Sequence, residues 1–287
     1  MPIDVDKALG AVLPVFESRW DEDTVILYHL GIGAGVPPTD PRELSYTYEA
    51  DLKVLPSFAT VPPFPMMGAI GGVDGLDFNF AMLLHGEQEI VLHRPIPANA
   101  TATHAGKISR IYDKGKGALV IIETDSRDAG GDLLFTNRSS VFLRGEGGFG
   151  GDSGPPAGNL PPDRAPDHVV ESPTLPQQAL LYRLSGDKNP LHADPNFAAF
   201  GGFDRPILHG LCSYGIVCKA VVDSVLGGDT GRVAGYTARF SGPVFPGETI
   251  VTKIWQEETG ILIEAVTKDR LSPVISNAIL TVRSSRT

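Results

Sequence analysis

The sequence has few of the features that mark secreted, membrane-spanning or zinc-binding proteins. Its 287 residues include only two cysteines, Cys212 and Cys218, which excludes a disulfide framework and a cysteine zinc site. No apolar run approaches the roughly 20 residues that a membrane-spanning helix needs. The N-terminus lacks the basic and apolar regions of a signal peptide, and the final Ser-Ser-Arg-Thr is not a peroxisomal targeting signal. We therefore expect a cytoplasmic protein with no membrane partner.

Positive charge is scarce as well. The chain carries 24 lysines and arginines against 34 acidic residues, which gives a net charge of −10. Proteins that bind nucleic acids gain affinity by neutralising phosphates, so this balance argues against a nucleic-acid partner. A small anionic ligand would need a local basic patch. Such side chains lie within and after residues 182–214: Arg183, Lys188, Arg205 and Arg239.

Two long stretches are typical of antiparallel β-sheets. Each contains segments rich in β-branched and aromatic residues, and turn residues such as glycine and aspartate separate these segments. In the first stretch the expected strands are residues 89–93, 101–108, 118–124 and 133–143. In the second they are residues 233–240, 248–256, 260–268 and 274–283.

The two stretches match each other. Residues 95–101, Pro-Ile-Pro-Ala-Asn-Ala-Thr, align with residues 243–249, Pro-Val-Phe-Pro-Gly-Glu-Thr, at a constant offset of 148. A flexible linker rich in glycine and proline, residues 145–167, lies between the two stretches. We therefore predict two copies of one α+β domain, residues 1–150 and 151–287. In each copy an antiparallel sheet would wrap around a long apolar element.

The segments before the strands differ between the copies. In the second copy, the apolar run over residues 211–226 predicts the central helix. In the first copy, residues 56–75 are rich in proline and glycine and cannot form a continuous helix, so we expect a partly buried, irregular wall. Further upstream, the apolar positions of residues 1–35 indicate a helix, and residues 46–55 indicate a short strand.

Only the second copy carries a cluster of residue types suited to catalysis. Asp187, Asn189 and His192 lie close together in the chain, and Gly186 and Pro190 prevent this run from forming a regular helix. A carboxylate and an imidazole that share one water can add water to an activated double bond, because one takes a proton as the other gives one. The same run also suits a turn in which the acid bonds the backbone and the histidine is structural.

The neighbouring residues allow two interpretations each. Asn189 either orients the substrate or the dyad, or it caps the turn. The backbone N–H of Gly210, at the start of the predicted helix, either polarises a carbonyl with help from the helix dipole, or the glycine is required by close packing. We expect His209 to be structural and predict no metal site. The other histidines considered lack the spacing of metal ligands: His29, His93, His104 and His168.

Residues 185–194, Ser-Gly-Asp-Lys-Asn-Pro-Leu-His-Ala-Asp, resemble the signature of the MaoC-like, type 2 (R-specific) enoyl-CoA hydratases. Residues 206–211, Pro-Ile-Leu-His-Gly-Leu, resemble the second conserved block of that family. In the first copy, residues 84–88 and 112–117 resemble the N-terminal repeat of the hydratase 2 unit of multifunctional β-oxidation enzymes. The resemblance covers nearly the whole chain, with no departure at any catalytic position.

This resemblance implies a double hot-dog fold, in which two helix-wrapped sheets pack as a pseudo-dimer within one chain. It also implies the reversible addition of water to a trans-2-enoyl-CoA, which gives a (3R)-3-hydroxyacyl-CoA. By carry-over from the family, Asp187 and His192 would hold the catalytic water, Gly210 would polarise the thioester carbonyl, and Asn189 would support the dyad. No cofactor is expected besides the CoA that the substrate carries, because hydration transfers no electrons.

The resemblance further assigns substrate contacts to both halves. His85, Gly86, Lys114 and Phe240 match positions that contact the acyl-CoA, and Lys188 beside the dyad is a further candidate. The irregular segment in place of a central helix would leave room for a bulky acyl chain. The expected partner is the acyl-CoA substrate, and the family's usual oligomer is a homodimer.

Three alternatives share this fold. A 3-hydroxyacyl-thioester dehydratase that acts on acyl-carrier protein would use the same dyad in reverse. A thioesterase would release a free thiol. A non-catalytic acyl-CoA-binding subunit would work only within a hetero-complex, although the intact dyad argues against this.

Overall fold

Ten antiparallel strands form one sheet within the residues that the computed structural model describes, 3–156 and 158–283. Across the sheet the order is β1-β3-β4-β5-β2-β7-β10-β9-β8-β6. The first half of the chain supplies β1 (Phe16–Trp20), β2 (Leu83–Leu92), β3 (Ala100–Asp113), β4 (Gly117–Asp128) and β5 (Leu133–Arg144). The second supplies β6 (His168–Pro173), β7 (Val233–Phe240), β8 (Thr249–Glu257), β9 (Gly260–Thr267) and β10 (Pro273–Val282).

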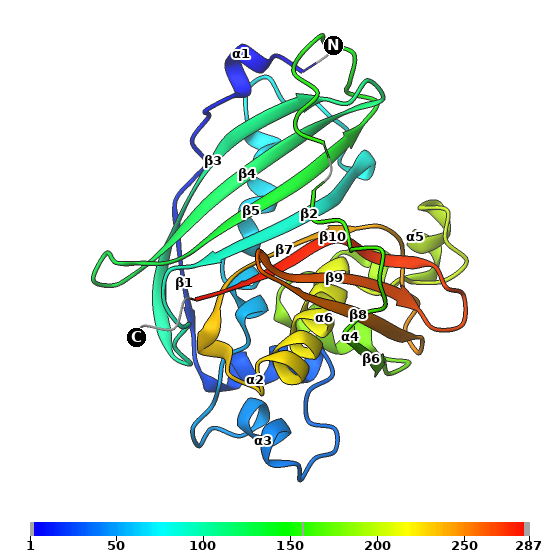
Figure 1. Ribbon diagram of the computed structural model, residues 1–287. Coiled ribbons are helices and arrows are strands. Elements are labelled where there is room, and N and C mark those ends of the chain that lie inside the picture. The colour runs from blue at the N-terminus through cyan, green and yellow to red at the C-terminus, as the bar shows by residue number, and fades with distance from the viewer. Residues whose placement is uncertain (1–2, 157, 284–287) are drawn as a thin grey trace.

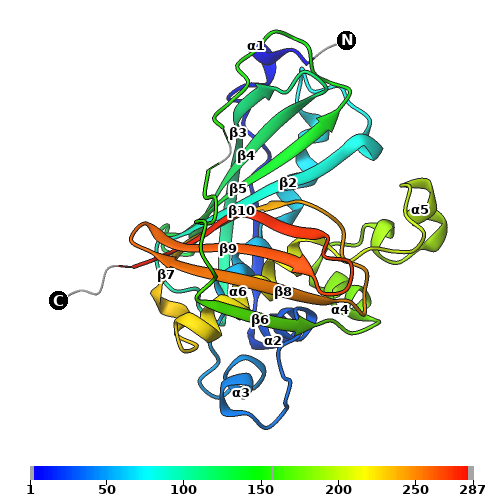
Figure 2. The ribbon, with the colours of Figure 1, turned by 45° about the vertical axis from the view of Figure 1, so that its right-hand side comes forward.

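The two halves meet where β2 pairs with β7, with Ile90 opposite Tyr236. The strands of the first half cross the upper part of Figure 1 and those of the second cross the lower part. In Figure 2 both sets are seen as one curved sheet. Each half carries the meander of strands that the alternating pattern predicts, β2–β5 and β7–β10. The predicted strands are confirmed, and tight turns that contain glycine separate β3 from β4 at residues 114–116 and β4 from β5 at residues 129–132.

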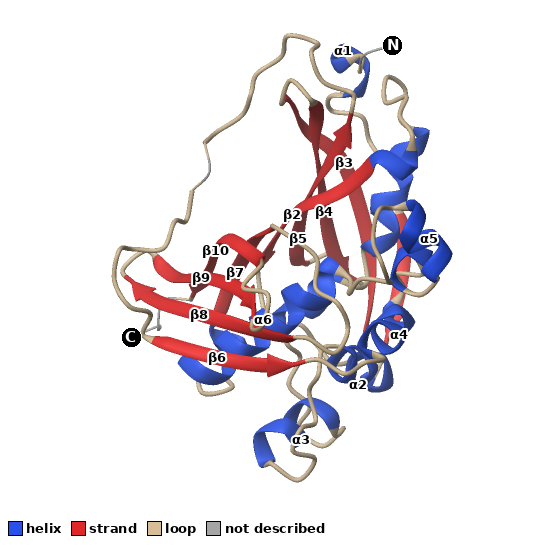
Figure 3. Ribbon diagram, turned by 90° about the vertical axis from the view of Figure 1, so that its right-hand side faces the viewer, coloured by secondary structure: helices blue, strands red, loops and turns tan. Residues whose placement is uncertain are grey.

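The predicted central helix is confirmed as α6 (Gly210–Val225), which is buried along most of its length. It ends where Gly227 and Gly228 adopt positive φ angles of 63° and 81°, which favour glycine and stop a helix. Figure 3 shows α6 against one side of the β6–β10 half of the sheet. No helix among the described residues has the length and apolar character needed to cross a membrane. The other α-helices are α1 (Val5–Ala8), α2 (Glu22–Gly31), α3 (Pro41–Thr47), α4 (Gln178–Tyr182) and α5 (Pro195–Phe200).

The first half has two 3-10 helices where its central helix would lie, η1 (Pro56–Thr60) and η2 (Phe64–Gly72). All five residues of η1 are buried, so the prediction of an irregular, partly buried wall is confirmed. The segment approaches the sheet closely: a Cβ atom on Gly106 of β3 would lie 2.7 Å from the sulfur of Met66. A side chain at position 106 would therefore require Met66 to move. Further 3-10 helices are η3 (Phe80–Met82), η4 (Arg183–Ser185), η5 (Pro190–His192) and η6 (Thr230–Arg232).

Three expectations about local structure need correction. The helix predicted over residues 1–35 is interrupted by β1, and α2 begins only after Asp21, whose carboxylate accepts a hydrogen bond of 3.0 Å from the Thr24 N–H. The strand predicted over residues 46–55 is instead the end of α3 and a turn. The edge strand β6 escaped prediction, because it is short and only partly buried.

The connection between the halves has no regular structure over its described part before β6, as predicted, but it is anchored to the sheet. The N–H groups of Gly148 and Gly150 donate to the Asp113 carboxylate over 2.9 and 2.7 Å. Further along, the Trp255 indole donates to the Arg164 carbonyl over 3.0 Å. Figure 3 shows this connection running over the side of the sheet opposite α6.

Candidate functional site

The turn that carries the predicted dyad is held by its own side chains. Gly186 has a φ of 124°, which a residue with a side chain rarely adopts. The Asp187 carboxylate accepts a hydrogen bond of 3.0 Å from the Asn189 N–H. The Asn189 side-chain oxygen in turn accepts one of 3.0 Å from the Leu191 N–H. Asn189 therefore caps η5 and fixes the loop between the acid and the histidine.

His192 is presented as a neutral base. Its ring is 7% exposed, and Nδ1 lies 2.8 Å from the Ile207 carbonyl oxygen. Because a carbonyl only accepts, Nδ1 carries the proton, and Nε2 has a free lone pair. Burial lowers the pKa of His192 from its ordinary value. The imidazole is therefore neutral near pH 7 and can accept a proton.

His209 lies directly against His192, which the sequence did not indicate. The two rings stack with centroids 3.7 Å apart at an angle of 29°. The Nε2 of His209 lies 3.2 Å from the backbone carbonyl of Asp187, so this nitrogen donates. Burial, followed by the neighbouring His192, lowers the pKa of His209 to about 2, and the ring stays neutral. His209 thus touches both members of the dyad. Its position next to Gly210 was the only available sequence signal.

Gly210 is the first residue of α6, with His209 at the N-cap position. The N–H groups of the first helical turn have no partner within the helix, and the helix dipole makes this end positive. Gly210 is exposed, so a ligand can approach this end of the helix. A Cβ atom here would lie 3.3 Å from the Phe240 ring, which is a tight contact. Both interpretations of this glycine, an amide donor and close packing, therefore fit.

The three side chains of this cluster converge on one point. Potential ligand atoms of Asp187, His192 and His209 all lie within 4.8 Å of one another. Such a group has the composition to hold a cation, although His209 already donates to the Asp187 carbonyl. The same arrangement brings a carboxylate and a neutral imidazole within reach of one water molecule, which is what proton transfer to and from a substrate requires.

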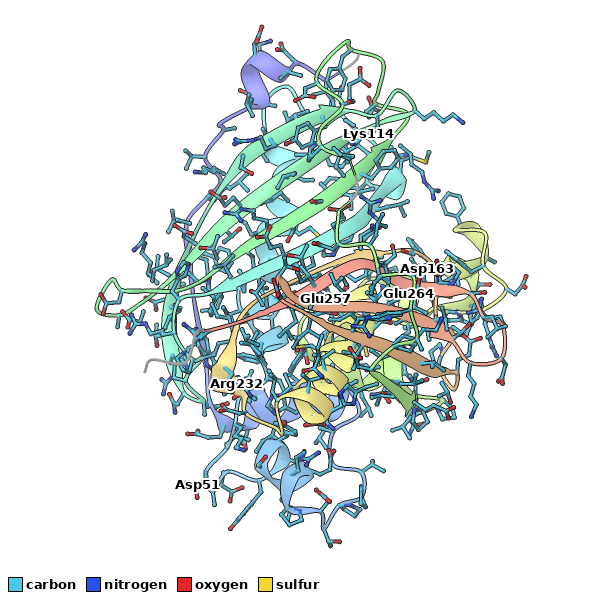
Figure 4. The ribbon with its side chains drawn as sticks, in the orientation of Figure 1. Asp51, Lys114, Asp163, Arg232, Glu257 and Glu264 are labelled. Carbon is cyan, nitrogen blue, oxygen red and sulfur yellow. The ribbon has the colours of Figure 1, made fainter. Side chains whose placement is uncertain are left out.

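A pocket of about 660 Å³ opens on the side of Gly210 where Phe240 lies. Three of the predicted substrate contacts line it: Gly86, Lys114 and Phe240. The ring of the fourth, His85, packs edge-on against Phe240 with centroids 4.9 Å apart. Figure 4 shows Lys114 at the β3–β4 turn, at the end of the molecule far from α3. Lys188 lies on the exposed surface of the dyad turn and does not line this pocket.

The pocket also has walls that sequence reasoning did not assign. Arg239 and Glu87 line it as an ion pair, with the guanidinium Nε 2.7 Å from the carboxylate. The linker contributes residues 153–156, and the Lys114 ammonium group donates to the Ser153 carbonyl. The pairing of β2 with β7 places Glu87 opposite Arg239, which no local sequence pattern indicates.

A smaller cavity of about 190 Å³ begins beside Gly186, the residue before Asp187. Side chains from β1 and from the irregular wall surround it, including Trp20, Phe58 and Phe64. A Cβ atom on Gly186 would meet nothing within 4 Å, so the backbone faces open space. The dyad turn is therefore flanked by a large pocket with charged side chains in its lining, near Gly210, and a small, mainly apolar cavity near Gly186.

Comparison with known proteins identifies the family. Residues 18–145 match the model of the MFE-2 hydratase 2 N-terminal domain, and residues 158–277 match that of the MaoC-like domain. The chain is 45% identical to the enoyl-CoA hydratase ChsH3 of Mycobacterium tuberculosis, over 97% of this chain and 98% of that protein. The chain belongs to the MaoC-like enoyl-CoA hydratase 2 family.

Two further relatives of this hydratase 2 family span the whole chain. The peroxisomal enoyl-CoA hydratase 2 of Arabidopsis thaliana is 40% identical over 96% of this chain and 94% of its own length. The crystal structure of a MaoC-like dehydratase from Phytophthora capsici superposes with a TM-score of 0.89 at 36% identity, over 99% of both chains. The predicted α+β, double hot-dog fold is thereby confirmed.

Proposed function

We propose that the protein is an (R)-specific trans-2-enoyl-CoA hydratase, a hydro-lyase that forms (3R)-3-hydroxyacyl-CoA reversibly. The supporting observation is the cluster of Asp187, His192 and His209, whose potential ligand atoms lie within 4.8 Å of one another, with Gly210 directly after His209 at the start of α6. The names of the relatives, which are enoyl-CoA hydratases, agree with this activity.

In this proposal the thioester oxygen lies at the Gly210 N–H, which stabilises the negative charge that develops on that oxygen. A water molecule lies between the Asp187 carboxylate and Nε2 of His192. As the water oxygen bonds to C3, one member of the dyad takes a proton from the water, and the dyad passes this proton to C2, so that it ends in its starting protonation state. The added hydrogen and hydroxyl both come from water. We therefore propose that neither a redox cofactor nor a metal takes part.

The two cavities suit the two ends of such a substrate. Lys114 and Arg239 place two cations in the large pocket, where they would bind the phosphates of CoA. The acyl chain would enter the small cavity, whose wall includes Phe58 and Phe64 of the irregular segment 56–75. This segment would then set the preferred chain length. If variants in it changed no chain-length preference, that part of the proposal would be wrong.

The test is a spectrophotometric assay with crotonyl-CoA and a longer trans-2-enoyl-CoA. We expect the absorbance of the enoyl thioester to fall with the wild-type protein and to stay constant with Asp187→Asn. Chiral analysis of the product should give the R enantiomer. Release of free thiol would instead indicate a thioesterase, and turnover only with an acyl-carrier-protein substrate would indicate the dehydratase alternative.

We further propose the division into an N-terminal binding domain, residues 1–150, and a C-terminal catalytic domain, residues 151–287. A homodimer in the cytoplasm remains the expected state. Light scattering of the purified protein tests the oligomer, and fractionation of cells tests the location.

A further inference from the structure

A chain of hydrogen bonds crosses three strands of the first half and has no part in the proposed reaction. Oγ of Ser18 on β1 lies 2.7 Å from Nε2 of His104 on β3. Nδ1 of the same ring lies 2.8 Å from Oγ of Ser126 on β4. His104 and Ser126 are fully buried, whereas Ser18 is partly exposed. The serine is therefore the end of this chain that a ligand can reach.

The central ring makes Ser18 adaptable. A neutral imidazole has one donor and one acceptor nitrogen. Burial lowers the pKa of His104 to about 4, so the ring is neutral near pH 7. In one tautomer Nε2 accepts from the Ser18 hydroxyl, and the Ser18 oxygen can accept from a third group. In the other tautomer Nε2 donates to Ser18, whose O–H is then free to donate.

Ser18 also lines the small cavity beside Gly186. The rest of that lining is largely apolar, with Trp20 on the same strand and Val61 and Phe64 on the irregular wall. Thr24 is a second hydroxyl in the lining, but it already donates to the Asp21 carboxylate over 2.7 Å. Ser18, backed by His104, is thus a polar group with spare hydrogen-bonding capacity in a largely apolar cavity, whose other polar lining residues are Arg19 and Thr24.

We propose that Ser18 is a subsite for an oxygen-bearing group, a hydroxyl or a carbonyl, on the acyl chain at a distance from the thioester. This inference rests on the proposed function, because it assumes that the acyl chain enters this cavity. A plain hydrocarbon chain displaces water from Ser18 without replacing its hydrogen bonds, whereas an oxygen-bearing chain restores one. The preferred substrates are then enoyl-CoAs whose acyl chain already carries an oxygen.

The experiment compares trans-2-enoyl-CoAs of increasing chain length, each with and without a terminal hydroxyl group. A neutral hydrogen bond contributes on the order of 1 kcal/mol, so at the length that reaches Ser18 we expect kcat/KM to favour the hydroxylated substrate about fivefold. Ser18→Ala should remove this preference, so that kcat/KM becomes about equal for the hydroxylated and the plain substrate. Val61→Ala, which enlarges the apolar side of the cavity, is the matched control and should keep the preference.

The outcomes separate this inference from the proposed function. Equal kcat/KM for both substrates at every length, or a preference that survives in Ser18→Ala, would overturn the subsite while leaving the hydratase intact. If no enoyl-CoA were hydrated, the proposed function would fail instead. Calorimetric binding of the same substrate pairs to Asp187→Asn and to Asp187→Asn/Ser18→Ala then tests the subsite without turnover. If Asp187→Asn and Asp187→Asn/Ser18→Ala bound the hydroxylated chain with equal affinity, the Ser18 subsite would be overturned.

Discussion

The two halves of the sheet share a strand pattern but cover their inner faces differently. In the second half α6 satisfies its own backbone hydrogen bonds and packs with apolar side chains. In the first half the short 3-10 segments leave backbone groups without such partners, and the sheet supplies them: Asn137 donates to the Ala59 carbonyl over 3.0 Å. Gln88 in turn donates to Asn137 over 2.8 Å. Replacing a helix by an irregular segment therefore requires polar side chains from the sheet.

Under the proposed function, this difference in structure matches different roles for the two halves. Asp187, His192 and Gly210 all lie on elements of the second half, and Lys114 and the irregular wall belong to the first. The half with the regular helix gains a helix N-terminus at which an oxyanion can be stabilised. The half without it gains cavity space. We expect substitutions in the second half to affect the chemical step and those in the first half to affect substrate binding.

The largest effect should come from the dyad. Asp187→Asn keeps a side-chain oxygen that can accept from the Asn189 N–H, so the turn should survive. The loss of proton transfer should lower kcat by about 100- to 10,000-fold, with little change in KM. Steady-state kinetics with crotonyl-CoA measure this, with the melting temperature as the folding control. Retention of more than a tenth of the wild-type kcat would remove Asp187 from the mechanism.

Acid should weaken the folded protein through buried histidines, several of which lie in the first half. Burial lowers the pKa values of His29, His85 and His104 from 6.5 to about 4 each. Between about pH 4 and pH 6.5 the unfolded chain therefore binds more protons than the folded chain. The free energy of unfolding should be constant above pH 6.5 and fall as the pH drops from 6.5 toward 4. Urea denaturation across this range tests it. His104→Phe should flatten the decline, and an unchanged slope would contradict the assignment.

Substitutions of His209 should show whether it positions the dyad. His209→Phe keeps an aromatic ring against His192 and loses the hydrogen bond to the Asp187 carbonyl, whereas His209→Gln keeps a donor and loses the ring. We expect kcat to fall about fivefold in each, since each removes roughly 1 kcal/mol of orientation energy. The acid limb of the pH profile of kcat should shift only in His209→Gln, which lacks the aromatic ring. Equal and unshifted pH profiles would mean that His209 is structural.

Changes in the large pocket should act on binding alone. Lys114→Met removes a cation from the first half, and we expect KM to rise about fivefold while kcat stays constant, as for a partly exposed charge–phosphate contact. The effect should shrink at high salt. Lys188→Met is the control, because Lys188 lies outside the pocket lining. A fall in kcat for Lys114→Met would break the separation between the two halves.

The smallest effect is expected from metal removal. Asp187, His192 and His209 have the composition of a cation site, but the proposed reaction uses them for proton transfer. Prolonged dialysis against a chelator should therefore leave kcat unchanged. Loss of activity that returns on adding a divalent ion would replace the proton-transfer role with a metal site.

Much of the architecture was predictable from local signals, and the remainder depends on contacts between distant segments. Alternation and turn glycines gave β2–β5 and β7–β10, and the apolar run gave α6. The Asp187–His192 run is local, so its candidate chemistry could be predicted from the chain. By contrast, the apolar spacing over β1 predicts a helix, because the spacing of a few residues fits both the helical and the strand period. The stacking of His209 on His192 and the Glu87–Arg239 pair arise only from tertiary folding.

The linker between the halves also affects how strong the noncovalent contact between those halves has to be. A covalent tether keeps the two halves at a high effective concentration, so the β2–β7 pairing does not have to hold them together unaided. Residues 153–156 of that tether are at the same time a wall of the large pocket. Proteolytic cleavage there would therefore disconnect the two halves and remove part of the wall of the large pocket at the same time. The dyad turn and the small cavity are built from other segments and would keep their structure.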